Sequence, residues 1–150
     1  MLKRISLFSL TKLGYNMYTS KTKVRVRYSE TDMMGYCYYG NYASYFEVAR
    51  VEAIRQLGFS YRQMEDDGVA LPVLEFSIKY FKPAFYDDEL TVETTVVEIP
   101  RARINFEYKT FNAEGVLLNE AKTTLVFINK NTMKPCAAPD DFVLELKKYF

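Results

Sequence analysis

The sequence contains no histidine. This absence excludes hydrolases that depend on a Ser-His or Cys-His pair. It also excludes zinc sites built on histidine ligands and dehydratases that use a histidine base. Acid–base chemistry near neutral pH must therefore come from a carboxylate, a tyrosine, a lysine or a cysteine. We expect neither a metal site nor a cofactor.

The net charge is small, and cysteine is rare. The 20 Lys and Arg residues balance 19 Asp and Glu residues, which leaves a net charge of +1. A broad basic field for nucleic acid is missing, so no nucleic-acid partner is expected. The two cysteines, Cys37 and Cys136, have no other metal ligands around them. They fit a reducing cytoplasm better than a disulfide scaffold.

Long apolar runs are absent too. No stretch approaches the ~20 apolar residues that a membrane span requires. The first 16 residues, MLKRISLFSLTKLGYN, have basic residues around a short apolar segment. They lack the longer apolar core and the cleavage site of a signal peptide. We expect residues 1–16 to be an extension, and residues 1–150 to form one domain.

Hydrophobic periodicity predicts the secondary structure. Residues 41–57 have apolar side chains three and four positions apart, which is typical of a helix, and Asn41 is a candidate cap for it. Glu47 and Arg50 on its polar face have the spacing of a surface ion pair. Period-two patterns and β-branched residues predict strands at 23–28, 71–82, 89–99, 103–111 and 116–129, with a helical turn in 59–68 and a C-terminal helix from Pro139. This order indicates an α+β fold, with about five antiparallel strands wrapped around one long central helix.

The rest of the chain is organised around residues 28–58. An extended segment ends in the carboxylate of Asp32, a turn follows at Gly35, and tyrosines precede the expected helix. This order places a carboxylate beside the amino end of a helix. Free N–H groups point outward at that end and favour negative charge. Such an arrangement suits hydrolysis of an acyl bond.

Two segments carry a resemblance to a known family. The first is YSETDMMG (28–35) with YGNY (39–42) and FEVAR (46–50), and the second is YFKPAFYDDEL (80–90). Together they resemble the 4-hydroxybenzoyl-CoA thioesterase family, and most closely its small bacterial acyl-CoA thioesterase branch. The resemblance covers roughly residues 23–142.

The resemblance implies a hot-dog fold that assembles as a homodimer or homotetramer, with acyl-CoA hydrolysed in sites between subunits. It implies that Asp32 is the catalytic carboxylate and that the backbone N–H of Tyr39 polarises the thioester carbonyl. Many members have histidine at or next to the position of Tyr39, and this chain does not. The substrate-binding candidates are Tyr38, Gly40, Asn41, Arg101, Arg103 and Lys134, the last three for the phosphates of CoA.

Several alternatives stay open at this stage. Asp32 could be a turn or capping residue, since aspartate favours such positions. As a catalyst it could act as a general base or as a nucleophile. The substrate could be a fatty or an aromatic acyl-CoA, or the thioester of an acyl carrier protein. The chain could also be an acyl-CoA-binding protein without catalysis.

Overall fold

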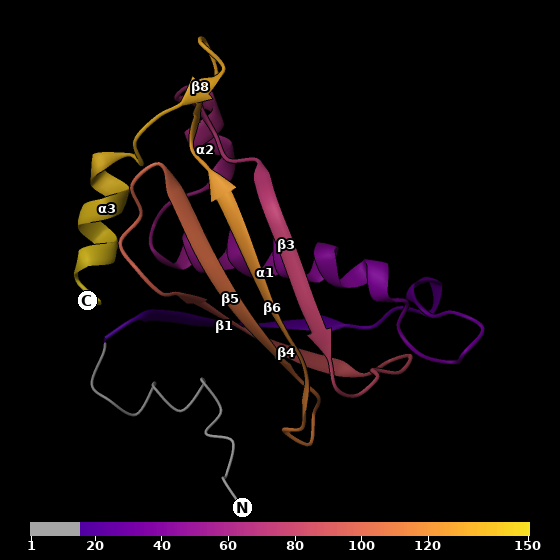
Figure 1. The fold of residues 1–150 in the computed structure, drawn as a ribbon. Coiled ribbons are helices and arrows are strands. Elements are labelled where there is room, and N and C mark those ends of the chain that lie inside the picture. The colour runs from indigo at the N-terminus through magenta and orange to yellow at the C-terminus, as the bar shows by residue number, and fades with distance from the viewer. Residues whose placement is uncertain (1–15) are drawn as a thin grey trace, which may run out of the picture.

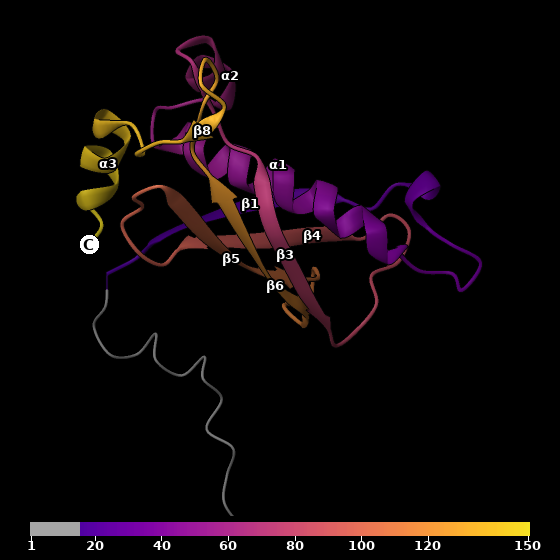
Figure 2. The same ribbon diagram turned by 45° about the horizontal axis from the view of Figure 1, so that its top comes forward.

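The computed structural model describes residues 16–150, so the predicted extension at residues 1–16 lies almost wholly outside the described part. The main sheet has five antiparallel strands in the order β1-β4-β5-β6-β3. Its strands are β1 (Tyr18–Arg25), β3 (Val73–Tyr80), β4 (Glu89–Val96), β5 (Arg103–Phe111) and β6 (Leu117–Val126). Helix α1 (Tyr42–Gln56) crosses one face of this sheet (Figure 1; Figure 2).

The remaining elements are short. The 3-10 turns η2 (Tyr28–Glu30) and η3 (Tyr39–Asn41) flank the loop that precedes α1, and η3 runs directly into α1. A small sheet joins β2 (Val69–Ala70), β7 (Ile128–Asn129) and β8 (Lys134–Pro135). Helices α2 (Tyr61–Asp66) and α3 (Asp140–Lys147) lie near the far end of α1 from that loop (Figure 1).

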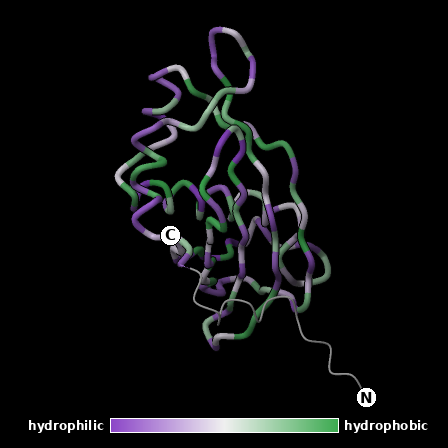
Figure 3. The backbone as a smooth tube through the Cα atoms, turned by 60° about the vertical axis from the view of Figure 1, so that its left-hand side comes forward, coloured by the Kyte–Doolittle hydropathy of each residue, from purple (hydrophilic) through white to green (hydrophobic). Residues whose placement is uncertain are grey.

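The core lies between α1 and the sheet. Phe46 of α1 is fully buried and stacks on Tyr108 of β5, with ring centroids 4.5 Å apart. Strands β4 and β5 alternate buried and half-buried residues along almost their whole length. Hydrophilic and hydrophobic residues are interspersed along the backbone (Figure 3). The expected aromatic stripe of the helix is therefore core, as its period predicted.

The α+β, five-stranded architecture with one central helix is confirmed. Strand 103–111 was predicted with the bounds that the structure has. Ser60 caps α2 by accepting the N–H of Gln63 at 3.1 Å, within the range 59–68 where a helical turn was expected. The C-terminal helix begins one residue after Pro139.

The first strand was misplaced. It was expected at 23–28, but β1 covers Tyr18–Arg25 and Tyr28 begins a 3-10 turn. Ser20 of β1 is buried although it is polar, so apolar alternation missed the first half of the strand. The strand ends at Arg25 because its partner β4 begins at Glu89.

The predicted polar face of the helix also needs correction. Arg50 was expected in a surface ion pair with Glu47, but Arg50 is only 8% exposed. No ion pair joins it to Glu47 within residues 16–150. Its position at the border of the apolar stripe lets the aliphatic stem of the side chain be covered. Glu52 and Arg55 do form an ion pair.

No helix within residues 16–150 is both long and apolar enough to cross a lipid bilayer.

The packing of the helix on the sheet predicts which side chains of α1 contribute most to the free energy of unfolding. Replacing Phe46 by alanine should lower the free energy of unfolding by about 3–5 kcal/mol, because a fully buried ring is lost and leaves a cavity. Urea unfolding at fixed protein concentration, followed by circular dichroism, measures this change. Val48 on the same helix is 48% exposed, so Val48→Ala should shift the value by no more than about 0.5 kcal/mol. Equal losses in both variants would contradict the assignment of the core.

Candidate active site

The loop between η2 and η3 folds back on itself. Thr31 and Cys37 form an antiparallel bridge, and the N–H of Asp32 donates to the carbonyl of Tyr36 at 3.1 Å. Gly35 closes the turn by donating to the carbonyl of Asp32 at 2.9 Å. Gly35 has φ of +83°, a conformation that glycine adopts without a steric cost. The two ends of the loop are thereby held side by side.

Asp32 is a turn residue that also lines a cleft. Its Oδ1 accepts the N–H of Met34 at 2.9 Å, which is the hydrogen bond of an Asx turn. Its side chain is half-buried and lines a cleft. The turn uses Oδ1, and no hydrogen bond within residues 16–150 is made to Oδ2.

The helix start presents free donors to the same region. The N–H of Asn41 donates to the carbonyl of Tyr38 at 3.0 Å, as expected inside a 3-10 turn. Within residues 16–150, no acceptor takes the N–H of Tyr39 or of Gly40, which are the first two of η3. Unpaired N–H groups at a helix start attract negative charge.

Two predictions about this helix start need comment. Asn41 was expected to cap the helix, but its side chain makes no capping bond. Instead its Nδ2 donates to the carbonyl of Glu30 at 2.7 Å. The backbone of Asn41 is already helical, with φ of −72° and ψ of −22°, whereas a capping residue usually has an extended backbone. A Cβ at Gly40 would lie 2.8 Å from Cε1 of Tyr38, so a larger residue there would displace the exposed Tyr38 ring.

The cleft has a volume of about 560 Å³ and is predominantly aromatic. Asp32, Tyr38 and Tyr39, which the sequence analysis singled out, all line it. Tyr80 reaches it from the end of β3 and donates its hydroxyl to the carbonyl of Tyr39 at 3.3 Å. The full lining is Asp32, Met34, Tyr36, Cys37, Tyr38, Tyr39, Tyr42, Tyr80, Phe81, Lys82 and Pro83.

The predicted phosphate-binding residues lie elsewhere in the chain. Arg103 begins β5 beside Val126, near the Val73 end of β3, and borders a separate hollow with Val73 and Pro135. Asp32 and its cleft lie at the Tyr80 end of β3. Since β3 has eight residues, the two ends are separated by roughly 25 Å. Within one chain, the structure does not bring Arg103 to Asp32.

Arg101 and Lys134 share that remote end. The carbonyl of Arg101 accepts the N–H of Ala138 at 2.7 Å, and Lys134 belongs to β8 of the small sheet. Both side chains are exposed.

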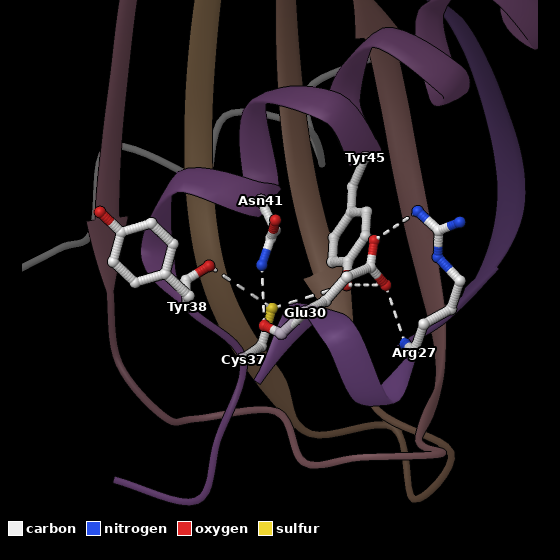
Figure 4. Close-up of polar contacts among 6 residues, drawn as sticks. All are labelled: Arg27, Glu30, Cys37, Tyr38, Asn41 and Tyr45. Carbon is white, nitrogen blue, oxygen red and sulfur yellow. Dashed lines mark hydrogen bonds and ion pairs between the residues drawn. The ribbon is translucent and has the colours of Figure 1, made fainter. Parts of the chain in front are cut away.

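A buried acid was missed by the sequence analysis. Glu30 is 7% exposed, and its carboxylate accepts hydrogen bonds from Arg27 and from the hydroxyl of Tyr45 (Figure 4). Burial alone would raise the pKa of Glu30, but the bonds from Arg27 and Tyr45 outweigh it and hold the pKa below its ordinary value. The spacing of Arg27 and Glu30, three residues apart, was the signal that could have revealed the contact.

Cys37 is buried within the loop. It is 4% exposed, and burial raises the pKa of its thiol. Its Sγ lies 3.5 Å from the hydroxyl of Tyr45. Within residues 16–150, no cluster of three or more histidine, cysteine or acidic side chains is placed to hold a metal ion. Asp87 and Asp88 form a turn, with Oδ2 of Asp88 accepting the N–H of Phe85 at 2.8 Å.

The lowered pKa of Glu30 predicts a pH dependence of stability. The folded chain binds the proton of Glu30 less tightly than the unfolded chain, whose pKa is near 4.5. The resulting stabilisation is therefore complete above that pH and is lost as pH falls through the lower folded-state pKa. Urea unfolding of wild type and Glu30→Gln between pH 7 and pH 3 should give a difference that shrinks toward low pH. A difference independent of pH would contradict this electrostatic contribution.

Three comparisons with known proteins identify the family and the fold. Residues 26–146 match the model of the thioesterase-like superfamily. Acyl-CoA thioester hydrolase YbgC of Escherichia coli is 35% identical over 125 residues, which cover 83% of this chain and 93% of that protein. The crystal structure of DHNA-CoA thioesterase from Staphylococcus aureus has a TM-score of 0.83 and 39% identity, covering 87% of this chain and 89% of that chain.

A 1,4-dihydroxy-2-naphthoyl-CoA thioesterase from Synechocystis has a TM-score of 0.80 at 25% identity, covering 86% of this chain and 96% of that chain. The hot-dog fold expected from the resemblance is thereby confirmed. The matched residues include Asp32, the helix start and the second segment at 80–90. The chain therefore belongs to the thioesterase-like superfamily.

Proposed function

We propose that this protein is an acyl-CoA thioester hydrolase in which Asp32 and the helix start act on a thioester bound in the cleft. The observation that carries the proposal is that Asp32 and Tyr39 line one cleft, with the N–H of Tyr39 unpaired within residues 16–150. Similarity to YbgC and to the DHNA-CoA thioesterase supports the reaction class. The proposal treats the chain as one thioesterase domain in a reducing cytoplasm, with residues 1–16 as an extension.

The chemistry divides between these two groups. The N–H of Tyr39, with that of Gly40 beside it, stabilises the oxyanion that forms at the thioester carbonyl. Asp32 either takes a proton from the attacking water or attacks the carbonyl itself and forms a mixed anhydride. In both routes the C–S bond breaks, the thiolate of CoA leaves and takes up a proton, and the acyl group is released as a carboxylic acid. In the second route, water hydrolyses the anhydride.

The cleft walls favour a flat acyl group. Tyr38, Tyr42 and Phe81 are among six aromatic side chains in the lining. Aromatic rings pack well on other rings through stacked and edge-to-face contacts. We therefore place an aromatic acyl-CoA before a fatty acyl-CoA as substrate, as the names of the two thioesterases of known structure also suggest.

A second copy of the chain completes the proposed site. β3 is an edge strand of the sheet, and Val73, Leu74, Phe76 and Tyr80 on it are 40–55% exposed. An exposed apolar edge strand is suited to pairing with another chain. We propose a homodimer in which two β3 strands pair antiparallel around a two-fold axis, and the same pairs can assemble further into a homotetramer.

This pairing explains the remote cations. Antiparallel β3 strands bring the Val73 end of one copy beside the Tyr80 end of the other. Arg101, Arg103 and Lys134 of one subunit would then lie at the mouth of the cleft that contains Asp32 of its partner. There they would bind the phosphates of CoA, and Lys82 in the cleft lining would add a cation from the same chain.

Replacing Asp32 tests the catalytic role. Asp32→Asn keeps an oxygen for the N–H of Met34 and removes only the charge, whereas Asp32→Ala removes both. We expect both variants to lower kcat by about 10²–10⁴-fold, while the asparagine variant keeps the thermal midpoint of the wild type. Release of free thiol from short, long and aromatic acyl-CoAs measures turnover.

The matched control is Asp88→Asn, another turn aspartate, which is not part of the cleft lining. It should turn over like the wild type. Wild-type turnover in either Asp32 variant would contradict the proposal. Binding of acyl-CoA without thiol release would favour a binding protein, and release only from acyl carrier protein would favour that alternative substrate.

Replacing Arg101 tests the phosphate contact and the dimer together. Arg101→Ala should lower kcat/KM for acyl-CoA by roughly 10–100-fold, the value of a charged hydrogen bond, and should change little for the acyl-pantetheine thioester, which lacks the nucleotide. Arg25→Ala on the opposite sheet edge is the control. An equal loss for both substrates would rule out phosphate contact.

Co-expression of Asp32→Asn with Arg101→Ala then identifies the contributing subunit. In a mixed dimer, one site has an intact Asp32 from one chain and an intact Arg101 from the other. Recovery of kcat/KM for acyl-CoA is therefore expected. No recovery in purified mixed dimers would mean that the site does not use Arg101 of the partner subunit.

A further inference from the structure

Glu30 is a buried acid that the proposed chemistry does not use. Its Oε1 accepts the N–H of Arg27 at 2.8 Å and the hydroxyl of Tyr45 at 2.9 Å. Its Oε2 accepts Nη2 of Arg27 at 3.0 Å. Tyr45 is itself 3% exposed and belongs to the first turns of α1. The carboxylate thus joins Arg27, which precedes η2, to the helix that follows the loop (Figure 4).

The backbone of Glu30 makes a second set of links. Its carbonyl accepts the N–H of Tyr38 at 2.8 Å and Nδ2 of Asn41 at 2.7 Å. Tyr38 directly precedes Tyr39, and Glu30 lies two residues before Asp32. Glu30 therefore makes contacts next to both parts of the proposed site, the carboxylate of Asp32 and the free N–H groups of the helix start.

Cys37, near the end of the loop, contacts Tyr45 as well. Its Sγ lies 3.5 Å from the hydroxyl of Tyr45, and its N–H donates to the carbonyl of Ala84 at 2.7 Å. The hydroxyl of Tyr45 is therefore shared between Glu30 and Cys37, at the base of the cleft that Cys37 lines.

We propose that Glu30 is a positioning residue, which through Tyr45 and its own carbonyl fixes the separation between Asp32 and the N–H of Tyr39. The inference rests on the proposed function of that pair. A reaction that needs two groups on either side of one carbonyl is sensitive to their spacing, and a displacement of about 1 Å can reduce the rate by about 10²-fold. Glu30 touches no atom of the cleft lining except through these links, so it is not itself catalytic.

A role in stability alone would make different predictions. Glu89 also accepts hydrogen bonds from two basic side chains, Lys23 at 2.9 Å and Arg25 at 3.1 Å. Those contacts join β1 to β4 on an exposed surface and do not involve the loop. Glu89→Gln is therefore a matched control, because it removes a comparable charge and leaves the loop contacts in place.

Two variants separate the links. Glu30→Gln keeps the side-chain length and the backbone carbonyl but removes the charge. Tyr45→Phe removes only the hydroxyl that joins the carboxylate to α1. Each should lower kcat by roughly 10–100-fold with KM changed by less than about three-fold, since the binding walls are unaltered while the reacting groups are displaced. Glu89→Gln should match the wild type.

Combining variants tests the route of the effect. Glu30→Gln with Tyr45→Phe should lose little more than either alone, because both break one link. In an Asp32→Asn background, Glu30→Gln should have no further effect. A multiplicative loss in that background, or wild-type kcat in Glu30→Gln when Asp32→Asn is inactive, would overturn the inference and leave the proposed function standing.

Amide hydrogen exchange gives a readout that needs no turnover. In Glu30→Gln, the amides of residues 31–41 should exchange faster than in the wild type, while those of β4 and β5 are unchanged. Wild-type exchange across residues 31–41 would overturn the inference even if no thioester is hydrolysed. Faster exchange in a chain that hydrolyses no thioester would instead count against the proposed function alone.

Discussion

Burial of one face of α1 against the sheet is the constraint on which the site depends. Phe46 is fully enclosed and stacks on Tyr108, and Tyr42 and Tyr45 are almost as deeply buried. A helix held by such side chains cannot slide or rotate without opening cavities in a close-packed core. The position of its first turn is therefore fixed relative to the sheet, and with it the direction of the free N–H groups of Tyr39 and Gly40.

The loop before the helix is fixed by polar contacts rather than by packing. Met33 and Met34 at its tip are exposed, so apolar burial contributes little there. Glu30 and Asn41 instead connect its two ends through hydrogen bonds to buried partners. Burying a carboxylate without partners costs free energy. When it has partners, its hydrogen bonds fix the relative positions of the groups that they join. The hydrophobic core thus supports a short loop whose conformation is set by directional hydrogen bonds to a charged side chain and to main-chain groups.

The elements that sequence predicted well are those with a strong local pattern. Strand 103–111 alternates without interruption, and the apolar spacing of α1 needs no other element to be recognised. β1 was misplaced because Ser20 is polar yet buried by its neighbours, which period-two reasoning cannot detect. Asp32 and Tyr39 were singled out through a motif, whereas the contact of Glu30 with Tyr45 joins residues 15 positions apart and is made only in the folded chain. The distance of Arg101 from Asp32 follows from strand direction, which no local pattern encodes.

The hydrogen bond between Met34 and Asp32 restricts what can happen at that carboxylate. Oδ1 accepts a main-chain N–H, which favours one orientation of the carboxylate, and within residues 16–150 no hydrogen bond is made to Oδ2. The two carboxylate oxygens of a free aspartate are equivalent, and the turn over residues 32–34 makes those of Asp32 different. If Asp32 attacks the thioester carbonyl through Oδ2 and water then opens the anhydride at the Asp32 carbon, isotopic oxygen from that water would enter at Oδ2, whereas the general-base route would leave the carboxylate unlabelled.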